Sequence, residues 1–177
     1  MNESRAWLQQ AISDLRAGDR EREAVQKVVT LHLCHAVGKY QQSVEKAIKA
    51  IIAALREAGF TNWQIGRGHE VATRYIPMLF RIPRTGNENL LQQLSRVLDG
   101  NTKARIKLLE SLAPKWPPPG QPFPRNTEYP FQDSAGWTYP AMRGIFSSSE
   151  IDEFQRLAHR VEWGVQRILS AISRTPK

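Results

Sequence analysis

The chain is poor in cysteine and contains no long apolar run. Its single cysteine, Cys34, can form no disulfide within the chain, and such cysteine usage fits a reducing compartment. No apolar stretch approaches the roughly 18 residues that a membrane span requires. The start of the chain, MNESRAW, lacks the apolar core of a signal peptide. We therefore expect a soluble, cytoplasmic protein.

Motifs of several common catalytic classes are also missing. The sequence has no glycine-rich phosphate loop, no serine elbow and no paired carboxylate motif. His32 and His35 are three residues apart, but neither has the companion ligands of a metal site. We expect no metal and no cofactor, and we interpret both histidines as half-buried helix residues.

Acidic residues are outnumbered by basic ones. Lysine and arginine total 25 against 17 aspartate and glutamate, which gives a formal net charge of +8. Between Arg67 and Lys107, eight basic residues stand against three acidic ones. The excess favours acidic partners such as RNA, a nucleotide or an acidic protein. The central region is therefore the first candidate for an electrostatic surface.

The strongest positive signal is a helical period between residues 32 and 55. A chain of 177 residues with 41% hydrophobic content is expected to fold as one domain, residues 1–177, around a core of its own. In this stretch, large apolar residues recur every three or four positions, as on one buried helix face. They are Leu33, Val37, Tyr40, Val44, Ile48, Ile51 and Leu55. This segment is predicted to be the core helix.

Two further stripes run along the same predicted helix. The small residues Ala36, Ser43, Ala47, Ala50 and Ala54 permit close approach of another helix, and packing within the chain is favoured over a dimer contact. A basic stripe lies roughly opposite the apolar face and consists of Lys39, Gln42, Lys46, Lys49 and Arg56. This stripe either follows phosphates or forms a solvated outer face, with Glu45 and Lys49 as an ordinary surface pair.

Other helix boundaries follow from glycine, proline and capping residues. The first helix is expected to start after Asn2 or Ser4 and to end at Gly18, after which Asp19 caps one long helix, or two nearly collinear ones, up to the stop at Gly59. A third helix starts at His69 and is disrupted near Ile76, since Pro77 lacks a backbone donor. A helical hairpin is expected at 88–98 and 102–112, and a last helix follows the capping box at 147–150.

Residues 113–140 hold eight of the eleven prolines together with six aromatic residues. This composition excludes a helix and favours a packed surface wrap over a free linker. The predicted fold class is therefore all-α, an up-and-down bundle of four or five helices. A helical-hairpin insertion at about 82–125 and a proline- and aromatic-rich wrap complete it.

Four short motifs resemble the HEPN domain family. The run YQQSVEKAIKA at 40–50 resembles the family's signature helix Q-x-x-E-K-A-x-K-A, and GHEV at 68–71 resembles the opening of its third helix. YP at 129–130 and the pattern A-x-x-V-E-W at 158–163 match in the same order. The resemblance implies a helical bundle that is often homodimeric, often paired with a nucleotidyltransferase, and active in toxin–antitoxin or defence systems.

The sequence departs from the family's ribonuclease motif Arg-x4-6-His. None of the four histidines has an arginine five to seven residues before it. Arg67 and His69 lie close together at a helix start, where free amides favour an anion. The simpler interpretation, that His69 caps its own helix and packs against the core helix, is favoured over an anion site. The candidate ligand-binding residues are Lys39, Lys46, Lys49, Arg67, His69 and Arg74.

Three functions remain open on this sequence. The first is a HEPN-like protein that binds RNA or a nucleotide and is non-catalytic or weakly catalytic. The second is a metal-independent ribonuclease toxin in which His69 and Arg67 act as catalytic residues. The third is a structural protein that builds an assembly without nucleic acid.

Overall fold

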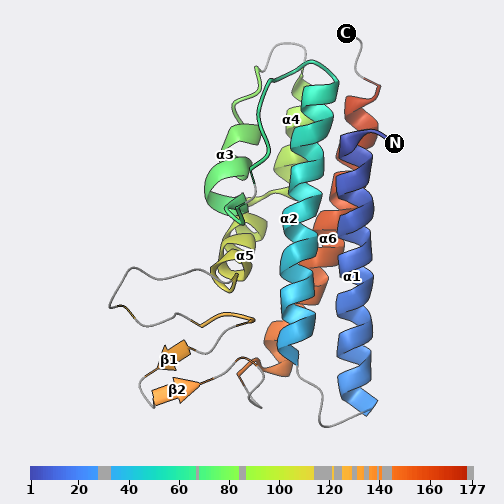
Figure 1. Cartoon of the computed structure of the whole chain (residues 1–177). Helices are drawn as coiled ribbons and strands as arrows, with labels where there is room; N and C mark the ends of the chain where they lie inside the picture. The colour runs from blue at the N-terminus through green and yellow to red at the C-terminus, as the bar shows by residue number, and fades with distance from the viewer. Residues whose placement is uncertain are drawn as a thin grey trace.

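The protein is a helical molecule built on three long helices (Figure 1). The computed structural model describes residues 1–27, 33–66, 68–83, 87–113, 121, 125–128, 131–133, 136–138, 140 and 145–174. Helices α1 (Glu3–Lys27), α2 (Leu33–Glu57) and α6 (Ser148–Ile172) pack against one another. Helix α1 runs opposite to α2 and α6 (Figure 1). The predicted all-α class is thus confirmed, with one short hairpin added.

Helix α2 is the centre of the core, as its period predicts. Its large apolar residues are buried, and only Leu33 at its start is partly buried. The small residues of its flank are covered within the single chain, where α1 and α6 pack against α2. Packing within the chain therefore accounts for that flank. No helix in the described residues is long and apolar enough to cross a membrane.

The predicted boundary at Gly18 is wrong. Helix α1 continues through Gly18 to Lys27, and Asp19 lies inside it instead of capping a new helix. A Cβ on Gly18 would lie 2.6 Å from Cε1 of Tyr40, so the glycine lets the buried Tyr40 ring pack against α1. The alternatives of one long helix or two collinear helices from 19 to 58 are also wrong, because α1 and α2 lie antiparallel side by side.

Short helical segments cover one side of the long helices (Figure 1). A π-helical turn η1 (Val71–Tyr75) passes into α3 (Ile76–Leu79), and the change falls where Pro77 predicts a disruption. Helix α4 (Glu88–Val97) and helix α5 (Gly100–Ser111) follow. The predicted pair of helices exists but is not a hairpin, since α4 packs on α6 while α5 packs on η1 and α6.

Residues 90–112 are part of the core. Leu90, Leu94, Leu98, Ile106, Leu109 and Leu112 belong to the same buried cluster as α2 and α6. At the contact between α4 and α6, a Cβ on Gly164 would lie 2.5 Å from Cγ1 of Val97. The absence of a side chain at Gly164 therefore allows α4 to approach α6 closely.

The proline-rich stretch is described only in part. Trp116, Phe123, Tyr129, Pro130 and Tyr139 lie outside the described residues. In the described part of this stretch, β1 (Phe131–Asp133) pairs antiparallel with β2 (Gly136–Thr138). The sequence analysis did not predict this hairpin. Trp137 is 68% exposed, contrary to its expected part in a packed wrap.

Arg125 joins the proline-rich stretch to the start of α6. Its guanidinium donates to the backbone oxygen of Ile145 at 2.5 Å and to Glu150 at 3.2 Å, and it covers the Phe146 ring. The predicted capping box is present, with Ser147 and Glu150 bonded reciprocally. Burial disfavours the ionised Glu150 carboxylate, but hydrogen bonds from Ser147 and Arg125 outweigh it and lower the pKa of Glu150.

Candidate functional site

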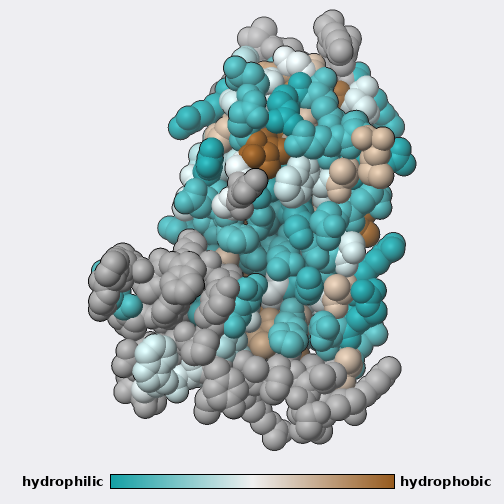
Figure 2. Space-filling view, in the orientation of Figure 1, coloured by the Kyte–Doolittle hydropathy of each residue, from teal (hydrophilic) through white to brown (hydrophobic). Residues whose placement is uncertain are grey.

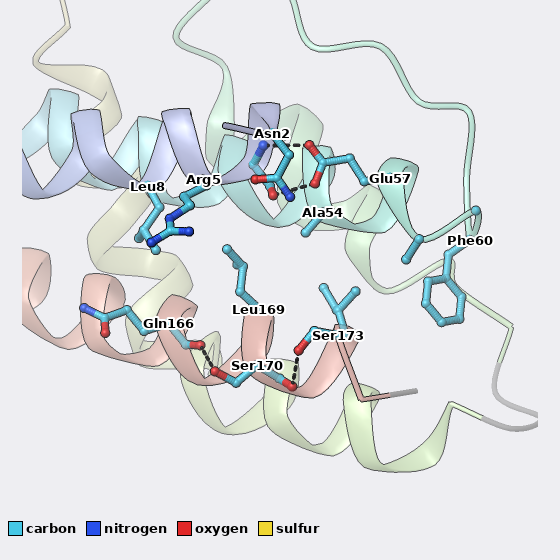
Figure 3. A pocket seen from close by; sticks show the side chains of 14 residues that line it. Asn2, Arg5, Leu8, Ala54, Glu57, Phe60, Gln166, Leu169, Ser170 and Ser173 are labelled. Atoms are coloured by element: carbon cyan, nitrogen blue, oxygen red, sulfur yellow. Dashed lines mark hydrogen bonds between the residues drawn. The ribbon is translucent and has the colours of Figure 1, made fainter. Parts of the chain in front are cut away.

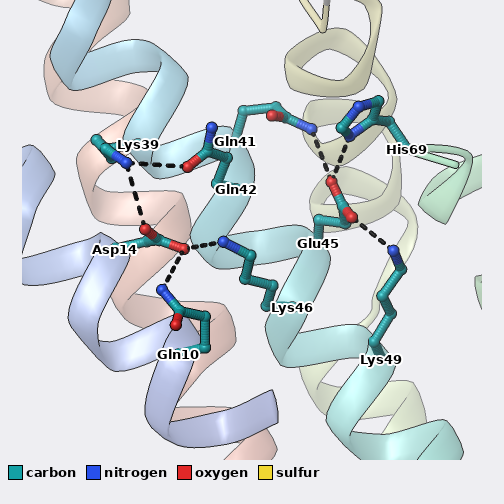
Figure 4. Close-up of polar contacts among 9 residues, drawn as sticks. All are labelled: Gln10, Asp14, Lys39, Gln41, Gln42, Glu45, Lys46, Lys49 and His69. Atoms are coloured by element: carbon teal, nitrogen blue, oxygen red, sulfur yellow. Dashed lines mark hydrogen bonds and ion pairs between the residues drawn. The ribbon is translucent and has the colours of Figure 1, made fainter. Parts of the chain in front are cut away.

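Two of the predicted ligand-binding lysines, Lys39 and Lys46, are held by one carboxylate of α1 (Figure 4). Asp14 is buried between α1 and α2, and both lysine ammonium groups contact it, Lys39 at 3.5 Å. Gln10 donates to the same carboxylate at 3.4 Å. These contacts join α1 to α2, so much of the charge of Lys39 and Lys46 is compensated within the chain.

Lys49 lies inside the protein, and its predicted place on an outer face is wrong. Its side chain is 2% exposed, and its Nζ atom lies 2.6 Å from Oε1 of Glu45 and 5.2 Å from the centre of the Trp7 ring. The predicted Glu45–Lys49 pair exists, but it is buried (Figure 4). Trp7 of α1 covers this face of α2, which the helical period alone assigns to solvent.

His69 and Glu45 are brought together from two different sequence motifs (Figure 4). Nδ1 of His69 lies 2.6 Å from Oε2 of Glu45, and Gln41 donates to the same oxygen at 3.4 Å. The imidazole is 43% exposed and the carboxylate 7% exposed. Glu45 therefore holds the imidazole from the protein side and leaves the outer part of the ring open to solvent.

This His–carboxylate pair can hold and transfer a proton, because an imidazole fixed by a carboxylate is the usual form of a general base. The space beneath it is small, with a cavity of about 10 Å³ lined by Glu45, His69 and Glu110 among others. That volume is at the lower limit for a single water. A ligand therefore reaches His69 only from the solvent side. Arg67, its predicted partner, lies outside the described residues.

Basic residues that are not paired with a carboxylate gather on η1, α3 and α5. Arg74 is exposed on η1 and lies over the Tyr75 ring, and Arg81 is exposed just after α3. Lys103 and Lys107 follow each other by one turn of α5, with Nζ of Lys103 4.5 Å from the centre of the Phe80 ring. Among the described residues no carboxylate pairs with any of these four cations.

The four cations are carried by elements that pack side by side, and we call them together the η1–α5 surface (Arg74, Arg81, Lys103 and Lys107). Helix α5 runs antiparallel to η1 and α3, because Lys103 contacts Phe80 while Glu110 accepts hydrogen bonds from Ala72 and Thr73. The exposed Glu70 precedes η1. On the face shown in Figure 2, hydrophilic residues predominate.

One hollow lies at the end of the long helices and contains none of the predicted site residues (Figure 3). It measures about 1140 Å³ and lies between the start of α1 and the ends of α2 and α6. Leu8, Ala54 and Leu169 give it apolar walls. Its carboxylate, Glu57, already accepts hydrogen bonds from the amide and hydroxyl of Ser4 at 2.9 and 2.6 Å.

Two other reactive side chains, Cys34 and Tyr40, are buried in the core. Burial raises the pKa of the Cys34 thiol, which disfavours a thiolate nucleophile. Burial, together with Asp19, raises the pKa of Tyr40, whose hydroxyl donates to Asp19 at 3.1 Å. Asp19 also accepts from Gln155 and pairs with His159. In the described parts of the chain, no three His, Cys, Asp or Glu residues are grouped to hold a metal ion.

Comparisons of the chain with protein-family models, curated proteins and solved structures found no match. The functional argument therefore depends on the residues themselves. They provide an imidazole held by a buried carboxylate and, separately, an exposed surface of four cations without ion-pair partners.

Proposed function

We propose that the chain is a HEPN-like protein that binds RNA or a nucleotide through the η1–α5 surface. The observation that carries the proposal is the set of four exposed or half-exposed cations without a carboxylate partner among the described residues. Cations of this kind exchange water and counterions for phosphate oxygens without breaking internal ion pairs. Lys39, Lys46 and Lys49 are assigned to the scaffold in this proposal, since each contacts a buried carboxylate.

The family resemblance supports the proposal at a second point. Glu45 in the signature helix contacts His69 in the GHEV motif, so two of the four motifs meet in space. The finer architecture that the family implies, an up-and-down bundle of four or five helices, belongs to the same proposal. In this architecture, the short helices η1, α3, α4 and α5 together take the place of one helix of the bundle, between α2 and α6 in the chain. A homodimer and a nucleotidyltransferase partner in a defence system are further parts of this prediction.

Neutralising two cations of this surface tests the proposal. The double variant Lys103→Gln/Lys107→Gln is expected to bind a single-stranded RNA roughly 10- to 30-fold more weakly at 0.1 M salt than the wild type. The slope of log K against log salt should fall from about −2.8 to about −1.4, because each phosphate contact on a single strand contributes about −0.7. Fluorescence anisotropy with a labelled oligonucleotide measures both quantities.

A matched control separates local contact from total charge. Arg16 and Arg20 are exposed, lie one turn apart on α1 and belong to no ion pair in the described structure. Arg16→Gln/Arg20→Gln removes the same two charges and should keep the wild-type affinity and slope. Equal losses in both double variants, or no binding of RNA at low salt, would refute the proposed surface.

The ribonuclease alternative has one observation in its favour, the contact between His69 and Glu45. If His69 is a general base, His69→Ala should lower RNA cleavage by about 100-fold or more. His159→Ala is the matched control, since His159 is also a surface imidazole paired with a carboxylate, Asp19 at 3.0 Å. Equal cleavage by both variants and by the wild type, measured on a labelled RNA in EDTA, would exclude this role.

A further inference from the structure

A polar groove lies between α4 and α6, away from the candidate ligand-binding residues that the sequence predicts. It measures about 590 Å³, within the range of small-ligand sites. Asn89 and Gln93 line it from α4, Trp163 and Arg167 line it from α6, and Arg174 lines it from the turn after α6. No carboxylate belongs to its lining in the described structure, so its fixed charges are positive.

Trp163 is unusual because it is 60% exposed, whereas tryptophan is usually highly buried. It precedes Gly164, where Val97 of α4 packs directly against α6. The close approach of the two helices fixes the backbone that carries the indole. The guanidinium carbon of Arg167 lies 4.8 Å from the indole centre and covers the ring. The indole therefore stands on a packed part of α6, beside Arg167, while much of its surface faces solvent.

The other groups in the groove are suited to the remaining parts of a nucleotide. Arg174 lies in the turn just after α6, lines the same groove as Arg167, is exposed, and pairs with no carboxylate in the described residues. The Nε2 group of Gln93 donates to Oδ1 of Asn89 at 3.2 Å, which leaves further amide donors and acceptors of both side chains for a ligand. An aromatic face, two guanidinium groups and two amides match a base, its edge and its phosphate.

We infer that the α4–α6 groove binds one unstacked nucleotide, with the base against Trp163 and the phosphate near Arg174. This inference rests on the proposed function and adds a site separate from the η1–α5 surface. The nucleotide is either part of a single-stranded RNA or free in solution, since both offer the same base and phosphate. Duplex RNA does not fit, because its bases are stacked and paired.

The test compares two exposed tryptophans in the full-length protein. Trp163→Leu is expected to weaken binding of a single-stranded decanucleotide by about 5- to 150-fold, the usual loss when base stacking on an aromatic side chain is removed. Trp137→Leu, which changes the 68% exposed tryptophan of β2, should bind as the wild type does. Duplex RNA of the same length should bind equally to all three proteins. Thermal unfolding of each variant checks that the fold is retained.

Titration with AMP and adenosine distinguishes the two sources of the nucleotide. If AMP binds the wild type, and Trp163→Leu abolishes that binding, the groove accepts a free nucleotide. If only the oligonucleotide binds in a Trp163-dependent manner, the groove takes an RNA nucleotide. Arg174→Gln should weaken the affinity for whichever of the two binds, and it should leave adenosine binding unchanged.

One result would refute nucleotide binding in the α4–α6 groove and leave the proposed function intact. That result is RNA binding that depends on Lys103 and Lys107 but is equal in Trp163→Leu and Trp137→Leu, together with no Trp163-dependent binding of AMP. Absence of all RNA and AMP binding by the wild type at low salt would overturn both.

Discussion

Replacing Glu45 with alanine is expected to lower the free energy of unfolding by about 3–5 kcal/mol, the largest change that we predict for a polar residue. Glu45 is the carboxylate partner of Lys49, whose side chain is only 2% exposed. Removing the Glu45 carboxylate leaves the buried Lys49 ammonium group without a counter-charge. It also removes the hydrogen-bond partner of His69 and Gln41. Urea denaturation followed by circular dichroism measures the difference.

Two further variants identify the cause of the loss. In Glu45→Leu/Lys49→Met both charges are replaced by apolar side chains, so most of the lost stability should return. Glu23→Ala removes an exposed glutamate of α1 and should change stability by less than about 0.5 kcal/mol. If Glu45→Ala is as mild as Glu23→Ala, the buried ion pair does not contribute as described.

The second large effect is expected at Leu94 of α4. This side chain is fully buried in the core that α2 and α6 share, so Leu94→Ala should cost about 2–5 kcal/mol through lost burial and a cavity. Leu108→Ala makes the same chemical change on α5 at a side chain that is 52% exposed, and it should cost less than about 0.5 kcal/mol.

The form of the unfolding curve gives additional information. If α4 is integral to the core, Leu94→Ala should shift the whole transition to lower urea without dividing it. A separate early transition, with the main transition at the wild-type position, would show instead that residues 82–125 behave as an independent insertion.

The sequence was most informative where one local rule decides the structure. The apolar period of α2 depends only on helix geometry and on burial of one face, and its residues are buried as predicted. The capping box at Ser147 and the left-handed glycine at Gly59 are decided within a few residues, and both are present, with φ of +81° at Gly59. The change from η1 to α3 beside Pro77 follows from a missing backbone donor.

Prediction failed where a distant part of the chain decides. Gly18 resembles a helix stop, but its role depends on Tyr40, 22 positions later, whose ring occupies the space of a side chain. Lys49 resembles a surface residue until α1 places Trp7 against it. The break between α1 and α2 had a weak local signal, the β-branched run Val28-Val29-Thr30, which lowers helix propensity but rarely ends a helix alone.

The candidate site shows the same division. His69 could be chosen from its place at a helix start, but its carboxylate partner could not, because Glu45 lies 24 residues earlier and resembles a surface residue. The basic central region was predicted from charge alone. The structure divides it into ion-paired residues, such as Arg105 with Glu153, and the unpaired cations of the η1–α5 surface. Trp163 was noted only as part of a motif, since exposure cannot be read from a helical period.

Lysine-reactivity footprinting with and without single-stranded RNA tests the central claim most directly. Acetylation of Lys103 and Lys107 should fall when RNA is bound, whereas Lys39, whose side chain is 40% exposed and contacts Asp14, should react equally in both states. Protection of Lys39 without protection of Lys103 and Lys107, or no protection at any lysine, would contradict RNA binding by the η1–α5 surface.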